Sequence, residues 1–287
     1  MQGDKKSFSS VIKANIGDAH AMGNKPITFI RQVMALITHP PLLETDQFPE
    51  DAKSRARDIL AGCRGGSVGA YSDSPGIEII RRHVANYIME RDGGIQSDWR
   101  NVMLCAGASE GIRAVLKLMT NPGGDNVKRP GVMIPIPQYP LYSASLAEYN
   151  MEQVGYYLDE KRNWALDTQE LQRAIKDGKK RCDVRAIVVI NPGNPTGQVL
   201  TRDNIESVIK FAYAEHLFIF ADEVYQHNVY DQKSAFHSFK KVNILRMKWT
   251  ALTLSPTRLS WKWGLPTLRW RSPPSCPAAR GTWESVG

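Results

Sequence analysis

Two apolar strands, joined by a helix and each followed at once by polar side chains, constrain this fold more than any other feature of the sequence. Residues 184–190 are β-branched and almost continuously apolar, which is typical of a strand buried on both faces of a sheet. Residues 216–220 have the same character, and residues 202–213 between them have the apolar spacing of an amphipathic helix. Strand, helix and strand in this order predict a right-handed crossover between parallel strands.

Polar residues follow each of these strands. Asn191–Gly197 reads Asn-Pro-Gly-Asn-Pro-Thr-Gly, and Ala221–Tyr225 reads Ala-Asp-Glu-Val-Tyr. Ligands of parallel sheets bind at the carboxyl ends of the strands, so we expect Asn194, Asp222 and Tyr225 to lie at one edge. Each segment alone has an ordinary structural interpretation, because Asp222 could cap a helix and Asn-Pro-Gly could form only a turn. Both segments in this order and spacing favour a ligand site.

A third segment has the pattern of a phosphate site. Residues 102–105 predict a short strand, residues 106–110 a loop of small side chains, and residues 109–119 a helix. The free N–H groups and the dipole at the start of such a helix attract an anion. Many other turns between a strand and a helix share this pattern, so it is weak evidence for a phosphate site unless the two other segments are considered with it.

Together these segments resemble the fold-type I aminotransferases, which depend on pyridoxal 5′-phosphate. The resemblance implies an α/β fold, with a large domain of three layers in which helices cover both faces of a mostly parallel sheet. It implies that Asp222 stabilises the protonated pyridine nitrogen of the cofactor. It also implies that Asn194 and Tyr225 hydrogen-bond the phenolic oxygen, and that Ala108 and Ser109 hold the phosphate.

Three further residues take roles from the same resemblance. Tyr139 matches the tyrosine that stacks on the pyridine ring, although it could also be a core or turn tyrosine. Tyr71 matches the tyrosine that reaches the phosphate of the neighbouring subunit, so the resemblance implies a homodimer. Gly17 would lie near the substrate carboxylate, or it could be only a bend in the chain.

Four segments narrow the resemblance to the alanine aminotransferases (glutamate–pyruvate transaminases). They are residues 14–23, 25–33, 134–142 and 236–242, and the likeness runs from about residue 8 to residue 242. It implies amino transfer between L-alanine and 2-oxoglutarate, giving pyruvate and L-glutamate, so the partners are an amino acid and a 2-oxo acid. Another fold-type I enzyme, related to the aminocyclopropane-carboxylate synthases, is an alternative because it shares Asn-Pro-x-Asn-Pro-Thr-Gly. The N-terminal segments argue against it.

The Schiff-base lysine of the family has no counterpart in the sequence. In the family it lies in a Ser-x-Ser-Lys-Gly motif, about forty residues after the aspartate. Lys240 and Lys241 come too early, and Lys262 is flanked by Trp261 and Trp263, which would crowd a site that needs small residues. We therefore predict no catalytic lysine and an inactive chain. Such a chain could bind the cofactor without catalysis or pair with a complete subunit as a dominant-negative product.

The last part of the chain differs in composition from the rest. Residues 243–287 hold five of the seven tryptophans and show no persistent apolar period. We expect an N-terminal segment at 1–50, a partial cofactor-binding large domain at 51–242, and a disordered tail outside the family at 243–287. The small C-terminal domain of the family is expected to be absent. A shifted reading frame at residues 279–287 permits codons for Lys-Gly-Tyr-Met-Gly, so our hypothesis is a truncated splice variant translated out of frame.

The net charge of +8 does not indicate nucleic-acid binding. The tail holds seven of the thirty-seven Lys and Arg but only one of the twenty-nine Asp and Glu, so the rest of the chain is nearly balanced. The four cysteines and six histidines lack metal-ligand spacing, which predicts no metal site and fits a reducing compartment. No apolar run resembles a secretion signal or a membrane span, so we expect a cytoplasmic or mitochondrial protein.

Overall fold

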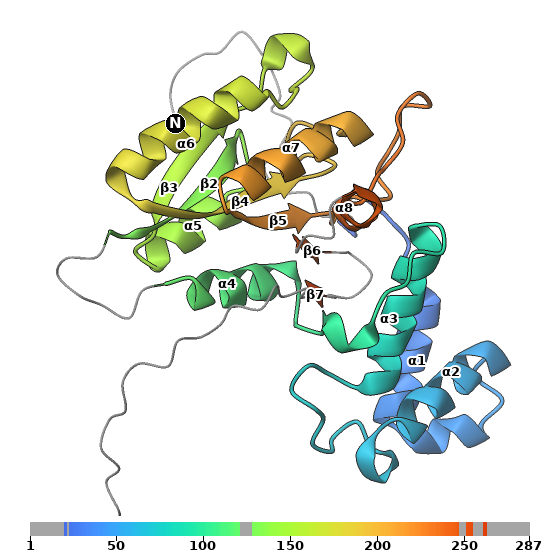
Figure 1. Ribbon diagram of the computed structural model, residues 1–287. Helices are drawn as coiled ribbons and strands as arrows, with labels where there is room; N and C mark the ends of the chain where they lie inside the picture. The colour runs from blue at the N-terminus through green and yellow to red at the C-terminus, as the bar shows by residue number, and fades with distance from the viewer. Residues whose placement is uncertain (1–19, 22, 121–127, 247–250, 255–260, 263–287) are drawn as a thin grey trace, which may run out of the picture. The chain divides into compact units, whose positions relative to one another are not determined.

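The computed structural model describes residues 20–21, 23–120, 128–246, 251–254 and 261–262 (Figure 1). The chain divides into two compact units, residues 1–72 and residues 73–287. The regions predicted from the sequence divide at residues 50 and 242 instead, and that division stays a prediction.

The first unit is helical. It contains α1 (Thr28–Thr38), the 3-10 helix η1 (Pro40–Glu44), α2 (Glu50–Ala61) and the 3-10 helix η2 (Arg64–Gly66). Apolar side chains at helical spacing pack between α1 and α2, and the buried ones are Val33, Leu36, Ala52 and Ala56. The sequence assigned no helix to residues 1–50, so α1 is a finding of the structure.

Five parallel strands form the main sheet of the second unit (Figure 1). Their order is β3 (Glu152–Tyr157), β2 (Pro130–Ile136), β4 (Asp183–Ile190), β5 (Phe218–Asp222) and β6 (Ala251–Leu254), and each neighbouring pair is parallel. The strands predicted at 184–190 and 216–220 are β4 and β5, and the helix predicted between them is α7 (Arg202–Ala214), so the parallel pairing is confirmed.

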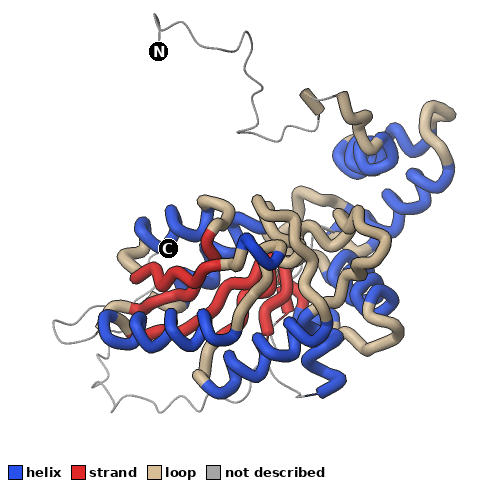
Figure 2. Tube along the Cα trace, turned by 90° about the horizontal axis from the view of Figure 1, so that it is seen from above, coloured by secondary structure: helices blue, strands red, loops and turns tan. Residues whose placement is uncertain are grey.

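Helices cover both faces of this sheet (Figure 2). Successive side chains of a strand point to opposite faces. On β4, Ile187 and Val189 pack in a cluster with α6 (Thr168–Arg181) and α7, whereas Ala186 and Val188 pack in a second cluster with α4 (Ala108–Leu118) and α5 (Leu141–Glu148). The predicted three-layer α/β architecture is therefore confirmed. The remaining described elements of the second unit outside the sheets are α3 (Glu78–Arg91), η3 (Trp99–Asn101), η4 (Glu160–Arg162) and α8 (Phe239–Arg246).

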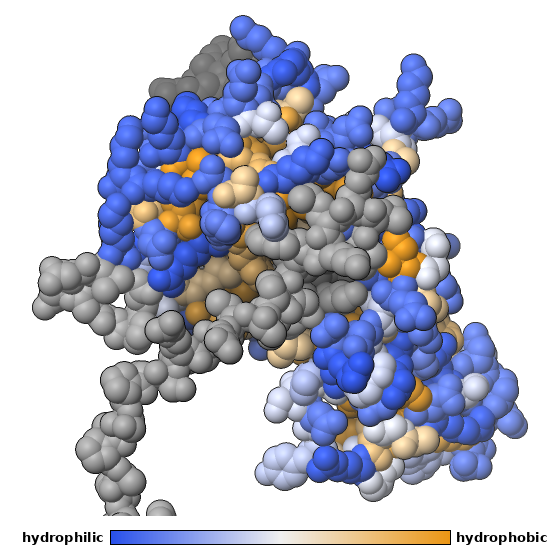
Figure 3. Space-filling view, viewed as in Figure 1, coloured by the Kyte–Doolittle hydropathy of each residue, from blue (hydrophilic) through white to orange (hydrophobic). Residues whose placement is uncertain are grey.

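Burial on both faces explains why β4 and β5 are so apolar. Ile187 and Phe220 are fully buried, and burying a side chain of this kind stabilises a fold by about 1.5–3 kcal/mol. In Figure 3, hydrophilic residues cover the outer surface of α6 and α7, and hydrophobic residues show between these helices and the strands. None of the described helices is long and apolar enough to cross a membrane.

Two short strands lie in the region for which the sequence predicted a disordered tail. β6 extends the main sheet beside β5, where it supplies hydrogen-bond partners that an edge strand would otherwise lack. β7 (Trp261–Lys262) pairs antiparallel with β1 (Val102–Met103) in a separate two-stranded sheet. The strand predicted at 102–105 is therefore shorter than expected and lies outside the five-stranded sheet.

Candidate active site

The loops that follow β4 and β5 begin side by side. Ile190, the last residue of β4, pairs with Asp222, the last residue of β5. The Asn191 N–H donates to the Asp222 carbonyl oxygen over 2.9 Å and so continues the pairing by one residue. Both polar motifs therefore start from one point at the carboxyl edge of the sheet, the edge at which ligands of parallel sheets bind.

The Asp222 carboxylate is held by one donor from α5 and one from its own loop. The Tyr142 hydroxyl donates to Oδ2 over 2.7 Å, and the Val224 N–H donates to Oδ1 over 3.2 Å. Asp222 is 7% exposed, and this burial raises its pKa, although the Tyr142 hydrogen bond opposes the shift. Burial and the neighbouring carboxylate raise the pKa of Tyr142 well above its ordinary value, so its hydroxyl stays a donor.

Asn194 and Tyr225 come together from the two neighbouring loops. The Asn194 Nδ2 donates to the Tyr225 hydroxyl over 3.3 Å. Tyr225 is 37% exposed, so the ring remains open to a ligand. The loop that carries Asn194 is closed by a hydrogen bond between its two ends: the Asn191 Oδ1 accepts from the Leu200 N–H over 2.9 Å. These contacts place an amide and a phenol next to each other beyond the end of the sheet.

The predicted phosphate residues lie in the first turn of α4. Gly107 precedes the helix with a φ of +118°, a conformation that side chains disfavour. No side chain caps the helix, so the first N–H groups of Ala108 and Ser109 lack the usual capping acceptor. The Glu110 carboxylate accepts from the Ala106 N–H just before the turn. The helix start thus offers donors suited to an anion, with one acidic side chain beside them.

For the other predicted residues, the structure gives fewer contacts or none. Tyr139 lies between β2 and α5, is 46% exposed, and accepts through its carbonyl oxygen from the Tyr142 N–H over 3.4 Å. Tyr71 belongs to the first unit and is 92% exposed. Gly17 lies outside the described residues, and Lys262 lies in β7 with its side chain outside the description. Their predicted roles stay predictions.

The Asp222 site fits a ligand that carries a buried positive charge. A buried carboxylate is costly unless a cation or strong donors face it. In the part of the chain that the structure describes, both donors to Asp222 are neutral, and no Lys, Arg or His forms an ion pair with it. The protonated pyridine nitrogen of pyridoxal phosphate would supply such a cation, so these residues fit that cofactor.

The side chain of Lys240, one of the lysines considered in the sequence analysis, is engaged in other contacts. Lys240 is 5% exposed, and its Nζ donates to the Ile95 carbonyl oxygen over 3.1 Å and lies 3.7 Å from the Asp92 Oδ2. Lys240 is therefore held in a buried ion pair at the end of α3. Lys240 lies in α8, and the sequence analysis excluded it because it follows the aspartate too closely.

Two residues of the site were not assigned a role from the sequence. Tyr142 lies in the same Pro-Gln-Tyr-Pro-Leu-Tyr segment as Tyr139, but only the packing of α5 on the sheet brings its hydroxyl to Asp222. Asn191 is fully buried and holds its loop through the Leu200 N–H. Its position directly after an apolar strand was the one available signal, because buried asparagine side chains need hydrogen-bond partners.

Known proteins resemble this chain over most of its length. The profile of the family "Aminotransferase class I and II" matches residues 33–257, which extends beyond the family boundary predicted at residue 242. Alanine aminotransferase 1 from Bos taurus is 61% identical over 241 residues, which are 84% of this chain and 48% of that protein. Glutamate–glyoxylate aminotransferase 1 from Arabidopsis thaliana is 44% identical and covers 83% of this chain and 49% of its own length. The chain spans about half the length of these curated relatives.

Solved structures of aminotransferases share the fold. One from Escherichia coli superposes with a TM-score of 0.67 at 23% identity, over 92% of this chain and 57% of that chain. Alanine aminotransferase from Pyrococcus furiosus gives a TM-score of 0.59 at 20% identity, over 86% of this chain and 63% of that chain. At these identities the likeness concerns the fold alone. The family match and the sequence relatives show that the chain belongs to the class I and II aminotransferases, a family that uses pyridoxal phosphate.

Proposed function

We propose that this chain carries the pyridoxal-phosphate site of an alanine aminotransferase, at which an amino group passes between L-alanine and 2-oxoglutarate. The observation that carries the proposal is the buried Asp222 carboxylate, which lies at the same sheet edge as the hydrogen-bonded Asn194 and Tyr225. Identities of 59–61% to alanine aminotransferases from Bos taurus, Danio rerio and Homo sapiens support the choice of substrates.

The residues of the site divide the task of holding the cofactor. When bound, the cofactor supplies an electron sink for the bond that breaks at the substrate Cα. Asp222 would keep a proton on the pyridine nitrogen, and Asn194 and Tyr225 would contact the phenolic oxygen. The N–H groups of Ala108 and Ser109 would bind the phosphate at the start of α4.

Three residues complete the proposal. Tyr139, which is half exposed beside α5, would stack on the pyridine ring. Tyr71 would reach the phosphate of a second copy of the chain, which makes the proposed assembly a homodimer. Gly17 would lie near the substrate carboxylate. A dimer that shares its sites predicts that substitution of Tyr71 weakens cofactor binding only where two chains associate.

A second candidate function is cofactor binding without catalysis. The sequence has no Ser-x-Ser-Lys-Gly motif after Asp222, and the Lys240 amine is engaged by Ile95 and Asp92. Loss of a general base commonly reduces a rate by about 10²–10⁴-fold. We therefore propose that the chain as written binds the cofactor and turns over alanine far more slowly than an enzyme with a complete site.

The test uses the full chain and two forms of the cofactor. Pyridoxamine 5′-phosphate has no aldehyde, so its binding reports the site independently of any lysine, and it is titrated by fluorescence against the wild type and Asp222→Ala. Pyridoxal 5′-phosphate is then added, fixed with borohydride, and the modified lysine is identified by mass spectrometry. Pyruvate formation from L-alanine and 2-oxoglutarate is measured in parallel.

The outcomes separate the two candidates. Saturable binding that Asp222→Ala weakens at least tenfold, with scattered lysine labelling and no pyruvate, supports a non-catalytic cofactor site. Stoichiometric labelling of one lysine together with pyruvate formation would show an active aminotransferase and overturn the inference about the lysine. Absence of saturable binding by the wild type would overturn the cofactor site itself.

A further inference from the structure

The turn after β5 positions two of the proposed cofactor contacts. The Gln226 N–H donates to the Glu223 carbonyl oxygen over 3.1 Å, which closes the turn around Val224 and Tyr225. Within this turn the Val224 N–H donates to the Asp222 Oδ1, and the Tyr225 hydroxyl accepts from Asn194. A shift of the turn would therefore move a donor to Asp222 and the Tyr225 phenol together.

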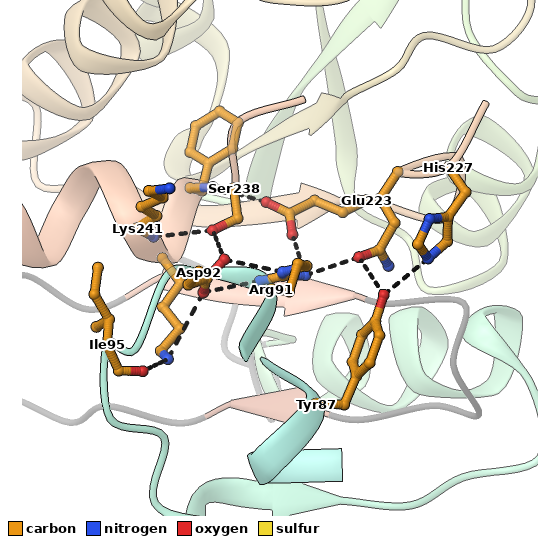
Figure 4. Close-up of polar contacts among 11 residues, drawn as sticks. Tyr87, Arg91, Asp92, Ile95, Glu223, His227, Ser238 and Lys241 are labelled. Carbon is orange, nitrogen blue, oxygen red and sulfur yellow. Dashed lines mark hydrogen bonds and ion pairs between the residues drawn. The ribbon is translucent and has the colours of Figure 1, made fainter. Parts of the chain in front are cut away.

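Arg91, at the last residue of α3, contacts this turn on both sides of Tyr225. Its Nη1 donates to the Gln226 Oε1 over 3.1 Å and to the Glu223 Oε2 over 3.4 Å (Figure 4). The Arg91 side chain is 10% exposed and that of Glu223 is 0% exposed. A planar guanidinium with fixed donors suits this bridging role, which a lysine amine would fill poorly.

Glu223 faces away from the proposed cofactor. Asp222 and Glu223 are consecutive, and their side chains take opposite directions as expected at the end of a strand. Asp222 points to Tyr142 of α5, whereas the Glu223 Oε1 accepts from the Phe239 N–H at the start of α8 over 2.7 Å. Glu223 thus ties the turn to α8 and, through Arg91, to α3.

The far side of Arg91 is fixed by a second carboxylate. Its Nε donates to the Asp92 Oδ1 over 2.9 Å, and Asp92 also accepts from the Ser238 hydroxyl over 2.8 Å. Lys240 lies beside Asp92, so Arg91, Asp92, Glu223 and Lys240 belong to one buried network of polar and charged contacts. A guanidinium restrained on one side can hold the turn on the other.

We propose that Arg91 is a positioning residue of the cofactor site, which clamps the turn 223–226 so that Asp222 and Tyr225 keep the geometry that binds the pyridine ring. This inference rests on the proposed cofactor site. None of the sequence motifs pointed to Arg91, and it touches neither Asp222 nor Tyr225 directly. The competing explanation is that the network only fastens α3 and α8 to the sheet and contributes nothing but stability.

The experiment compares Arg91→Met, Arg91→Lys and Glu223→Gln with Arg185→Met. Arg185→Met is the matched control, because it makes the same substitution at a guanidinium that donates to the Met119 carbonyl oxygen and pairs with Asp183 near the start of β4, and so alters no contact of the turn or of the Arg91 network. For each full-length variant the thermal midpoint is measured, followed by the dissociation constant of pyridoxamine 5′-phosphate well below that midpoint. The absorption band of the bound probe is also followed against pH, because it reports the protonation of the ring nitrogen.

We expect Arg91→Met to raise the dissociation constant about tenfold and to lower the pH at which the bound ring loses its proton by about one unit. Glu223→Gln should have a smaller effect in the same direction, and Arg91→Lys should recover part of the affinity. Arg185→Met should lower the thermal midpoint and leave both binding measurements unchanged. If Arg91→Met fails to fold, Arg91→Lys and Glu223→Gln decide the question by the same measurements.

Two results would overturn the clamp. One is that the folded Arg91 and Glu223 variants bind pyridoxamine 5′-phosphate with the same dissociation constant as the wild type, and that the bound ring loses its proton at the same pH. The other is a loss of affinity in Arg185→Met that matches theirs at equal loss of thermal stability. Either result would leave the cofactor site intact, whereas wild-type protein that fails to bind the probe would contradict the proposed function instead.

Discussion

The Tyr142 hydroxyl, on α5, donates a 2.7 Å hydrogen bond to the Asp222 carboxylate at the end of β5. Both groups are buried, and Tyr142 has no exposed surface. The bond joins α5 to the end of β5, so the helix layer on one face of the sheet fixes the carboxylate at its edge. Asp222 can then keep a defined orientation in an apolar setting, which is what a buried counter-ion for a pyridinium requires.

Tyr142→Phe should weaken cofactor binding without changing the packing of the ring. The substitution leaves a buried carboxylate with one donor fewer, and a hydrogen bond to a charged group contributes about 1.5–3 kcal/mol. We expect the dissociation constant of pyridoxamine 5′-phosphate to rise about tenfold. Tyr149→Phe is the control, because its hydroxyl accepts from Arg113 at the surface. Equal affinities for both variants would contradict the role given to Tyr142.

Asp222→Asn should separate stability from binding. Burial raises the pKa of Asp222, so the charged carboxylate is costly in the absence of a cation, and a neutral amide of the same size relieves that cost. We expect an unchanged or higher thermal midpoint of the protein alone, together with at least tenfold weaker binding of pyridoxamine 5′-phosphate. Asp183→Asn, at a surface ion pair with Arg185, should change neither quantity. A loss of stability without a loss of binding would contradict this assignment.

Strand burial explains how much of the fold could be predicted. β4 and β5 are covered on both faces, so their apolar runs and the amphipathic α7 between them are visible in the sequence. The short strands were predicted less well. The strand predicted at residues 102–105 is present as β1, but its local sequence did not indicate that it would lie outside the main sheet. β6 and β7 were not predicted, because they are four and two residues long and form through pairing partners distant in the chain, for which local sequence carries no signal.

The site was predictable where residues follow strand ends directly. Asn194, Asp222 and Tyr225 could be placed at one edge because two parallel strands end together. The contacts of Tyr142 and Arg91 could not be predicted in this way. Tyr142 is 80 residues from Asp222 in the sequence and Arg91 is 132 residues from Glu223, and only the packing of helices brings these pairs together. The direction of a side chain on a packed helix depends on tertiary contacts, which a single sequence does not contain.

Asn191→Ala should loosen the loop that carries Asn194. The Asn191 side chain is fully buried, and its Oδ1 accepts from the Leu200 N–H, which would be left buried without this partner. An unsatisfied buried donor costs about 1–3 kcal/mol. The substitution also removes the Asn191 Nδ2, a buried donor that has no partner in the described part of the structure, so we expect the free energy of unfolding in urea to fall by at most that amount. Asn228→Ala, which removes an exposed contact with Tyr230, should have little effect. Similar losses in both variants would show that burial of Asn191 is not the cause.

Glu223 should make the stability of the fold depend on pH. Burial raises its pKa from the ordinary 4.5 to about 8, and Asp92 and Asp222 add to this, although Arg91 and the Phe239 N–H oppose it. The folded state therefore binds one more proton than the unfolded chain between these two values. The stabilisation is fully present below about pH 4.5 and is lost as the pH rises through about 8, with a slope of at most about 1.4 kcal/mol per pH unit.

Glu223→Gln removes this titration and keeps an acceptor for the Phe239 N–H. The free energy of unfolding is measured in urea at several values between pH 5 and pH 9 for both proteins, and the difference between them is followed. Taking the difference cancels the surface carboxylates and Asp222, which titrate in both proteins. We expect the wild type to lose stability relative to the variant as the pH rises toward 8. A difference that stays constant, or one that grows in favour of the wild type, would show that Glu223 is ionised throughout and that Arg91 outweighs burial.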